Sequence, residues 1–154
     1  MKYRYVLLLA LLLIGGAGCK KNLSPEEQFE QDIIDIEDYI EKNNLNAQKT
    51  ASGLYYVINN LGTGNHPNSN DNVTVRYKGY LLDGTVFDQS QEEGITFNLQ
   101  QVIEGWTEGI PKYKEGGSGI LIIPSKLGYK DKKQGKIPAN SVLIFEVDLL
   151  MIQH

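Results

Sequence analysis

The polar side chains of this sequence offer little for acid–base, nucleophilic or metal chemistry. His66 stands in a polar loop and His154 at the terminus, so the histidines lack metal-ligand spacing and only His66 is available to a serine triad. Asp88 has the chemistry of a general acid or base, but no second carboxylate marks a partner for it. No glycine-rich phosphate loop follows a predicted strand. We therefore expect no metal, no cofactor and no hydrolytic reaction.

The aromatic side chains suggest a different chemistry, the binding of an apolar group. The only tryptophan, Trp106, lies between Gly105 and Gly109 in a short predicted helix. Because a glycine has no side chain, we expect these two positions to leave room for a ligand to approach one face of the ring. Other aromatic residues lie in short strands, where they are usually core residues. Trp106 is therefore the strongest indication of a pocket.

The elements that must position this pocket begin with a helix. Ser24 is a typical N-cap, Pro25 suits the first helical position, and Glu27 completes a capping box. We expect an amphipathic helix within residues 24–45. Its apolar stripe is Phe29, Ile33, Ile36 and Ile40, and acidic residues occupy much of the remaining surface: Glu30, Asp32, Asp35, Glu37 and Asp38.

This apolar stripe must be buried, either against the following domain or against the same helix of a second molecule. A sustained coiled coil needs three or more heptads, and the stripe is shorter than that. We therefore favour packing on the chain's own domain, and a monomer rather than a dimer.

Short strands replace the helical pattern after this helix. Period-two alternation and turn residues predict strands over residues 54–61, 73–78, 80–82, 85–87, 94–99, 119–124 and 142–152. Asp83 and Gly84 form the turn signal of a hairpin, and a short helix over residues 102–110 is stopped by Pro111. The predicted class is α+β, an antiparallel sheet with one helix packed on it.

Five segments, in this order and spacing, resemble the FKBP-type peptidyl-prolyl isomerase family. They are residues 75–80, 83–88, 102–109, 123–129 and 137–145. No single segment is specific, but the five in register are, and the resemblance covers about two-thirds of the chain. It implies that residues 52–154 form an isomerase domain, with an antiparallel β-sheet wrapped on one short helix and preceded by the N-terminal amphipathic helix.

The resemblance also implies a proline-binding site. Trp106 would be the floor beneath the prolyl ring, and Asp88 would place its carboxylate beside the twisting amide. The Ile103 amide and the Tyr129 hydroxyl would bind carbonyl groups of the substrate or of an inhibitor. The residues assigned to catalysis are Tyr77, Phe87, Asp88, Trp106, Tyr129 and Phe145, and substrate binding adds Ile95, Val102, Ile103 and Ile137.

Some of these assignments have a second interpretation. Phe145 and Val102 are equally compatible with simple core packing. Tyr77 has the alternative role of hydrogen-bonding Asp88 and holding the wall in place.

The implied reaction needs no acid, base or metal. Rotation about an Xaa-Pro bond faces a barrier of roughly 18 to 20 kcal/mol because resonance keeps the amide planar. Twisting reduces the charge separation in the amide, so an apolar pocket favours the twisted state relative to water. Hydrogen bonds to neighbouring carbonyl groups then hold the peptide during the twist.

The sequence departs from the family pattern at the rim of the implied site. Ile95 stands where many members have an aromatic lining residue. Lys130 follows Tyr129 where glycine is common, so we expect the loop near Tyr129 to differ in shape. Ala139 and Asn140 replace a Pro-His pair of some members. These departures concern the catalytic rate and inhibitor affinity rather than the fold.

Length and charge bound the possible partners. The chain has 154 residues, enough for one domain with a core, and a formal charge of -4. A nucleic-acid partner is not expected, because phosphate binding needs a cationic face. The single cysteine, Cys19, excludes a disulfide within the chain.

Residues 1–18 have the pattern of an export signal. Lys2 and Arg4 precede an apolar run over residues 6–14, and small residues lead to Cys19. This resembles a bacterial lipobox, although Gly16 replaces the usual large aliphatic residue. We expect a lipoprotein signal peptide, a lipid on Cys19, a tether over residues 19–23, and a location on a membrane of the bacterial envelope. The alternative is an ordinary secretory signal with an idle thiol.

Three functions therefore compete. The first is an envelope isomerase that acts on Xaa-Pro bonds of exported proteins and is bound by macrolide inhibitors of the FK506 type. The second is a holdase in which the pocket binds Pro-containing segments and turnover is incidental. The third is an interaction lipoprotein that uses the N-terminal helix to bind partners.

Overall fold

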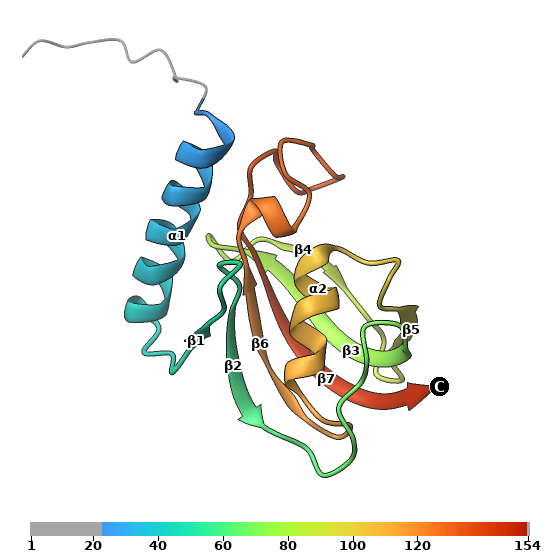
Figure 1. Ribbon diagram of the computed structural model, residues 1–154. Coiled ribbons are helices and arrows are strands. Elements are labelled where there is room, and N and C mark those ends of the chain that lie inside the picture. Colours follow the sequence, from blue (N-terminus) through green and yellow to red (C-terminus); the bar gives the residue numbers. More distant parts are fainter. Residues whose placement is uncertain (1–22, 154) are drawn as a thin grey trace, which may run out of the picture.

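The computed structural model describes residues 23–153, so the predictions for the signal segment, Cys19 and His154 lie outside the described residues. Figure 1 shows the arrangement of the elements. The helices are α1 (Pro25–Lys42) and α2 (Glu104–Gly109), with two short 3-10 turns, η1 (Ile110–Lys112) and η2 (Ser125–Leu127). The strands are β1 (Gln48–Lys49), β2 (Tyr55–Asn60), β3 (Asn72–Leu81), β4 (Val86–Gln89), β5 (Ile95–Asn98), β6 (Ser118–Ile123) and β7 (Leu143–Gln153).

The strands form one antiparallel sheet in the order β1-β2-β6-β7-β3-β4, and β5 pairs with β3 beside β4. Strand β3 is long enough to pair with β7 along one edge and with both β4 and β5 along the other. The α+β class, the antiparallel sheet, the short helix and the N-terminal helix are confirmed. Strand β1 and η2 were not predicted.

The two faces of the sheet are buried by different helices. On β7, Leu143, Phe145 and Val147 belong to the core cluster that contains Trp106 of α2, whereas Ile144 belongs to the cluster around Ile36 of α1. This alternation follows from the period of two in a strand. Figure 1 shows α2 against one face of the sheet and α1 beside β1 and β2. We call the face toward α2 the inner face and the face toward α1 the outer face.

Helix α1 begins as the sequence predicts. The Glu27 amide donates to the Ser24 hydroxyl (3.2 Å), and the Ser24 amide donates to the Glu27 carboxylate (2.9 Å), which is a complete capping box. The stripe packs on the chain's own domain. Ile36 is fully buried, and Ile33 and Ile40 are partly buried in the same cluster.

One acidic residue of α1 is not where the sequence pattern places it. Asp32 was expected on the exposed surface, but it is 1% exposed. It lies one helical turn before Ile36, on the side that faces the domain, and it has hydrogen-bond partners there. Among residues 23–153, no helix is long and apolar enough to cross a lipid bilayer.

Candidate active site

A cavity of about 580 Å³ lies on the inner face, between the sheet and the start of α2. It contains every predicted site residue of the described chain except Ile95. Its lining is Tyr77, Phe87, Asp88, Phe97, Gln101, Val102, Ile103, Trp106, Tyr129, Gln134, Gly135, Lys136, Ile137 and Phe145.

Trp106 lies at the base of this cavity with aromatic rings around it. Its ring meets Tyr77, Phe97 and Phe145 edge to face, at centroid separations of 5.1, 5.4 and 5.2 Å. Phe87 packs edge to face on Phe145 at 5.4 Å. Such contacts fix the ring planes more firmly than area burial alone. The Trp106 ring is thus held in one orientation by its three aromatic neighbours, and its role as a floor for a prolyl ring stays a prediction.

The glycines of α2 have a different role from the predicted one. A Cβ atom at Gly105 would lie 2.5 Å from Ile123, and one at Gly109 would lie 2.7 Å from Leu121. Both positions therefore face the sheet and allow α2 to approach it closely, rather than making room for a ligand. Close approach is what brings Trp106 against the inner face.

A glycine of the sheet that the sequence analysis did not consider shapes the wall. A Cβ atom at Gly79 would lie 2.5 Å from the ring of Phe87 and 2.9 Å from that of Phe145. The rings occupy the space that a side chain at position 79 would take. Gly79 is paired with Asp88 on β4 and with Phe145 on β7, and the second pairing joins strands far apart in the sequence, so no local pattern marks this glycine.

Asp88 is held in place from two sides. The Tyr77 hydroxyl donates to Oδ2 (2.6 Å), and the amide of Gln89 donates to Oδ1 (2.9 Å). Burial, and then the hydrogen bond to Asp88, raise the pKa of Tyr77 well above its usual range, so this hydroxyl remains a donor. Tyr77 therefore fulfils both interpretations, since it lines the cavity and also orients the carboxylate.

The two polar groups expected to hold carbonyls, from Ile103 and Tyr129, belong to residues that line the cavity. Ile103 is the N-cap of α2, and its carbonyl accepts the amides of Trp106 (2.9 Å) and Thr107 (3.2 Å). Its own N–H precedes the helical ladder. Burial, and then the charge of Asp88, raise the pKa of Tyr129, so its hydroxyl keeps the proton that a ligand carbonyl would accept.

The loop after Tyr129 accommodates its lysine. Lys130 has φ 58°, the left-handed conformation that glycine adopts most readily. Its amide donates to Ser125 (2.9 Å), its carbonyl accepts from Asn140 (2.7 Å), and its ammonium pairs with Glu104 at 2.9 Å. The lysine thus takes a glycine-like backbone conformation and links the loop to the first turn of α2.

Ile95 is the one predicted site residue that the structure does not bring to the cavity. Ile95 is 41% exposed and is not among the residues that line the cavity. Phe97, two residues further along β5, packs its ring against Tyr77 and Trp106 instead. The cavity therefore keeps an aromatic side chain from this strand.

Comparison with known proteins agrees with this geometry. Residues 63–150, more than half of the chain, match the family of FKBP-type peptidyl-prolyl cis-trans isomerases. The chain belongs to this family.

Relatives and solved structures support the assignment to the FKBP-type family. The chain is 51% identical over 109 residues to a probable FKBP-type isomerase, FkpA, of Neisseria meningitidis, with 69% of this chain and 40% of that protein covered. It is 38% identical over 138 residues to FkpA of Escherichia coli, covering 84% of this chain and 51% of that protein. The chain thus spans about half the length, or less, of these curated relatives.

Two solved structures show the same fold. The crystal structure of FkpA from Escherichia coli has a TM-score of 0.72 and 37% identity, and the match covers 84% of this chain and 62% of that one. A peptidyl-prolyl isomerase from Pseudomonas syringae has a TM-score of 0.74 and 30% identity, and the match covers 86% of this chain and 98% of that one.

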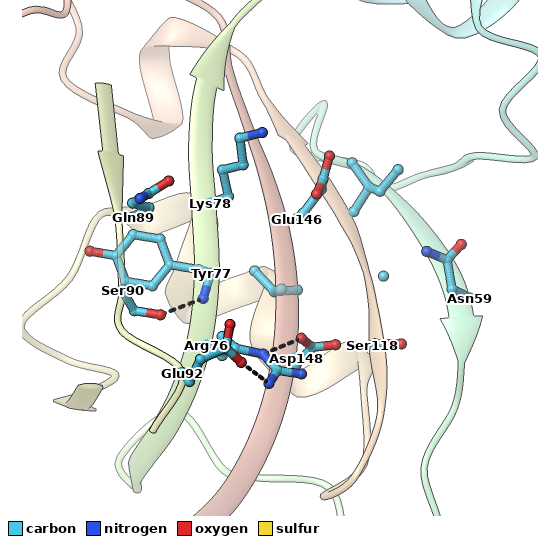
Figure 2. Close-up of a pocket in the computed structure, with 13 residues that line it drawn as sticks. Asn59, Arg76, Tyr77, Lys78, Gln89, Ser90, Glu92, Ser118, Glu146 and Asp148 are labelled. Carbon is cyan, nitrogen blue, oxygen red and sulfur yellow. Dashed lines mark hydrogen bonds and ion pairs between the residues drawn. The ribbon is translucent and has the colours of Figure 1, made fainter. Parts of the chain in front are cut away.

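This FKBP-type domain has a second cavity, of about 530 Å³, over the outer face of the sheet. Figure 2 shows Arg76 with its ion pairs to Asp148 (2.9 Å) and Glu92 (2.9 Å). Lys78 and Glu146 are direct cross-strand partners. Arg76 is paired with both acidic side chains, and the Glu146 carboxylate accepts from the Tyr80 hydroxyl (3.1 Å). Tyr77 also lines this cavity, but its ring belongs to the inner-face cluster around Trp106, so it gives this cavity no aromatic floor for a prolyl ring. The aromatic cavity is therefore the candidate active site.

Proposed function

We propose that this chain is a peptidyl-prolyl cis-trans isomerase that acts on Xaa-Pro bonds of exported proteins. The observation that carries the proposal is the cavity in which Trp106 is surrounded by aromatic rings and which Ile103 and Tyr129 also line. A prolyl ring is apolar and flat enough to lie on an indole, while its flanking carbonyls need hydrogen-bond donors. The cavity supplies both.

The geometry accounts for catalysis without bond breaking. The aromatic wall favours the twisted amide, which has less charge separation than the planar one. The Ile103 N–H and the Tyr129 hydroxyl hold neighbouring carbonyls, so that rotation is confined to one bond. Asp88, fixed by Tyr77, places a negative charge beside the wall. No proton has to move to carbon or oxygen.

The decisive experiment is a peptide isomerisation assay. The protein should accelerate cis/trans relaxation of an Xaa-Pro peptide, and Trp106→Ala or Phe145→Ala should reduce the acceleration. Equal relaxation rates with and without the protein would refute the proposal. If the protein suppressed aggregation of a Pro-rich client but left the relaxation rate unchanged, the holdase function would replace it.

We also propose that the cavity binds macrolides of the FK506 type. Such a ligand has an apolar ring for the floor and carbonyl groups for the Ile103 and Tyr129 donors. Trp106 is the only tryptophan of the chain, so its fluorescence reports on the site directly. A saturable fluorescence change that runs parallel to inhibition is expected, and inhibition without such a change would place the macrolide elsewhere.

The envelope location and the lipid anchor rest on the sequence of residues 1–19. We propose export, cleavage before Cys19 and lipidation of its sulfur. Cells labelled with a radioactive fatty acid should yield labelled protein in the membrane fraction, and Cys19→Ala should abolish both the label and the membrane association. A Cys19→Ala protein that stays in the membrane fraction would contradict the anchor.

We propose a monomer, because the apolar stripe of α1 is already covered by its own domain through Ile36 and its neighbours. Sedimentation of the lipid-free protein should give the mass of one chain over a wide range of concentrations. A concentration-dependent doubling of the mass would contradict this proposal.

A further inference from the structure

A buried carboxylate connects α1 to the segment that carries Tyr129. Asp32 is 1% exposed, and its Oδ2 accepts the backbone N–H of Ser125 at 2.7 Å. Its Oδ1 accepts the side-chain amide of Gln28 at 2.7 Å. Ser125 is itself 3% exposed, so both partners of the contact are withdrawn from water. The two residues are 93 positions apart in the sequence.

Burying a carboxylate is costly, and an apolar pair of the same shape often stabilises a fold as well or better. The contact is therefore poorly explained by stability alone. The contact fixes the orientation of the Ser125 backbone relative to α1, because a hydrogen bond from an N–H to a carboxylate weakens when its geometry departs from the preferred one. A second contact nearby supports the same junction, since the Lys126 ammonium lies over the ring of Phe29 of α1.

The hydrogen bonds of Ser125 lead from Asp32 to the active site. While the Ser125 N–H is held by Asp32, the Ser125 carbonyl accepts the amides of Gly128 (3.0 Å) and Lys130 (2.9 Å). These amides flank Tyr129 on both sides. Asp32 thus holds the amide side of Ser125, and the carbonyl side of the same residue anchors the turn around Tyr129, which lines the cavity.

We propose that Asp32 is a positioning residue of the isomerase site, which acts through Ser125 on the Tyr129 hydroxyl. Helix α1 would then hold the turn over residues 125–130 in place, in addition to covering the outer face of the sheet. The inference rests on the proposed isomerase function. Asp32 should also restrain the turn over residues 125–130, whether or not the protein is active.

The kinetic test uses the full chain with Asp32→Ala and Asp32→Asn. Because Tyr129 is assigned to holding a substrate carbonyl, the Ala variant should raise KM by about three- to tenfold, the equivalent of one hydrogen bond, with a smaller change in kcat. Asn retains an oxygen that can accept the Ser125 N–H, so it should recover part of the loss. The matched control is Glu30→Gln, an exposed acidic residue of the same helix, which should leave both constants unchanged.

A double-mutant cycle separates positioning from general destabilisation. In a Tyr129→Phe background the hydroxyl is absent, so Asp32→Asn should cause no further change in KM. If Asp32 variants lower the melting temperature but leave KM and kcat at wild-type values, the proposal is wrong. The same conclusion follows if the Asp32 effect persists undiminished in the Tyr129→Phe background.

Hydrogen exchange keeps the inference distinct from the proposed function. Asp32→Ala should accelerate exchange of the Gly128 and Lys130 amides more than that of amides in β3, and unchanged protection would overturn the proposal. An inactive wild-type protein would refute the isomerase function. The exchange rates of the Gly128 and Lys130 amides would still show whether Asp32 restrains the turn. If neither Asp32 variant folds, Gln28→Ala, which loosens Asp32 by removing one partner, is measured instead against the same criteria.

Discussion

Replacing Trp106 by alanine should separate the aromatic floor from the rest of the site. The indole is 4% exposed, and its Nε1 has no hydrogen-bond partner among the described residues. The substitution therefore removes packing but no hydrogen bond. A buried Trp→Ala change costs about 3 to 5 kcal/mol. Domains of this size have about 5 to 15 kcal/mol of stability, so the variant should still fold.

The effect on activity follows from the contact that the prolyl ring loses. Three ring methylenes at about 0.8 kcal/mol each contribute about 2.4 kcal/mol when they are fully buried. The floor covers one of the two ring faces, so its removal should cost about 1.2 kcal/mol. This corresponds to a decrease of about eightfold in kcat/KM. Part of that decrease should appear in kcat, because the floor also excludes water from the twisting amide.

The matched control is Trp106→Phe. Phenylalanine keeps an apolar ring at the base and removes a buried N–H that costs about 1 to 3 kcal/mol when it has no partner. Removing the unpaired N–H should offset part of the stability lost to the void that the smaller ring leaves. The free energy of unfolding should therefore stay closer to wild type than in the Ala variant. We expect kcat/KM to fall by about threefold or less. The assays are peptide isomerisation and urea unfolding. A folded Ala variant with wild-type kcat/KM would refute the role of the floor.

Three further predictions follow from the same structure. Tyr77→Phe keeps the ring but frees Asp88, so kcat/KM in the peptide assay should fall by about three- to tenfold with little change in stability; an unchanged value would show that orienting the carboxylate is unimportant. Tyr113 is fully buried, and its burial raises the pKa of its hydroxyl. Above about pH 10 the unfolded state loses this proton and the folded state keeps it. The free energy of unfolding should therefore fall by about 1.4 kcal/mol for each pH unit above about 10. Urea unfolding at several alkaline pH values should show this slope reduced in Tyr113→Phe, and equal slopes would contradict the assignment. Gly79→Ala should cost about 1 to 3 kcal/mol in urea unfolding and lower activity, because its Cβ would overlap the Phe87 ring; wild-type stability would show that the ring moves freely.

Features set by local chemistry could be predicted from the sequence. The capping box of Ser24 and Glu27 forms as expected because both partners lie within one turn of each other. Strand β3 around Val73 and Val75 follows the alternation of apolar and polar residues. The burial of Ile36 follows from the helical period.

The errors concern relations between elements. Ile95 and Phe97 are two residues apart on β5 and point to the same face, so alternation cannot tell which of them reaches the cavity. Their positions follow from the pairing of β5 with β3, which places Phe97 opposite Val73 and Ile95 opposite Val75. Asp32 appeared exposed because charged residues usually are, and its partner Ser125 lies far away in the sequence.

The site residues themselves were predicted mainly through the family resemblance. Aromatic side chains in short strands are ambiguous between core and pocket, and here they are both. Phe145 is 5% exposed and packs on Trp106, yet it also lines the cavity. No local pattern distinguishes a core ring that also lines a cavity from a core ring that is fully enclosed. The spacing of several aromatic residues along the whole chain makes this distinction, through the family resemblance.

Side chains of β6 and β7 point alternately to the core around Trp106 and to α1, so the same two strands contact both. Phe145 faces the cavity while Ile144, the next residue, faces α1, and the same alternation holds for Leu121 and Ile122 on β6. Any shift of α1 that moved Ile144 would therefore act on the backbone that carries Phe145. The contact of Asp32 with Ser125 adds a second connection, to the segment that carries Tyr129. Helix α1 thus contacts the rest of the domain both through the apolar cluster around Ile36 and through the hydrogen bond from Ser125 to Asp32.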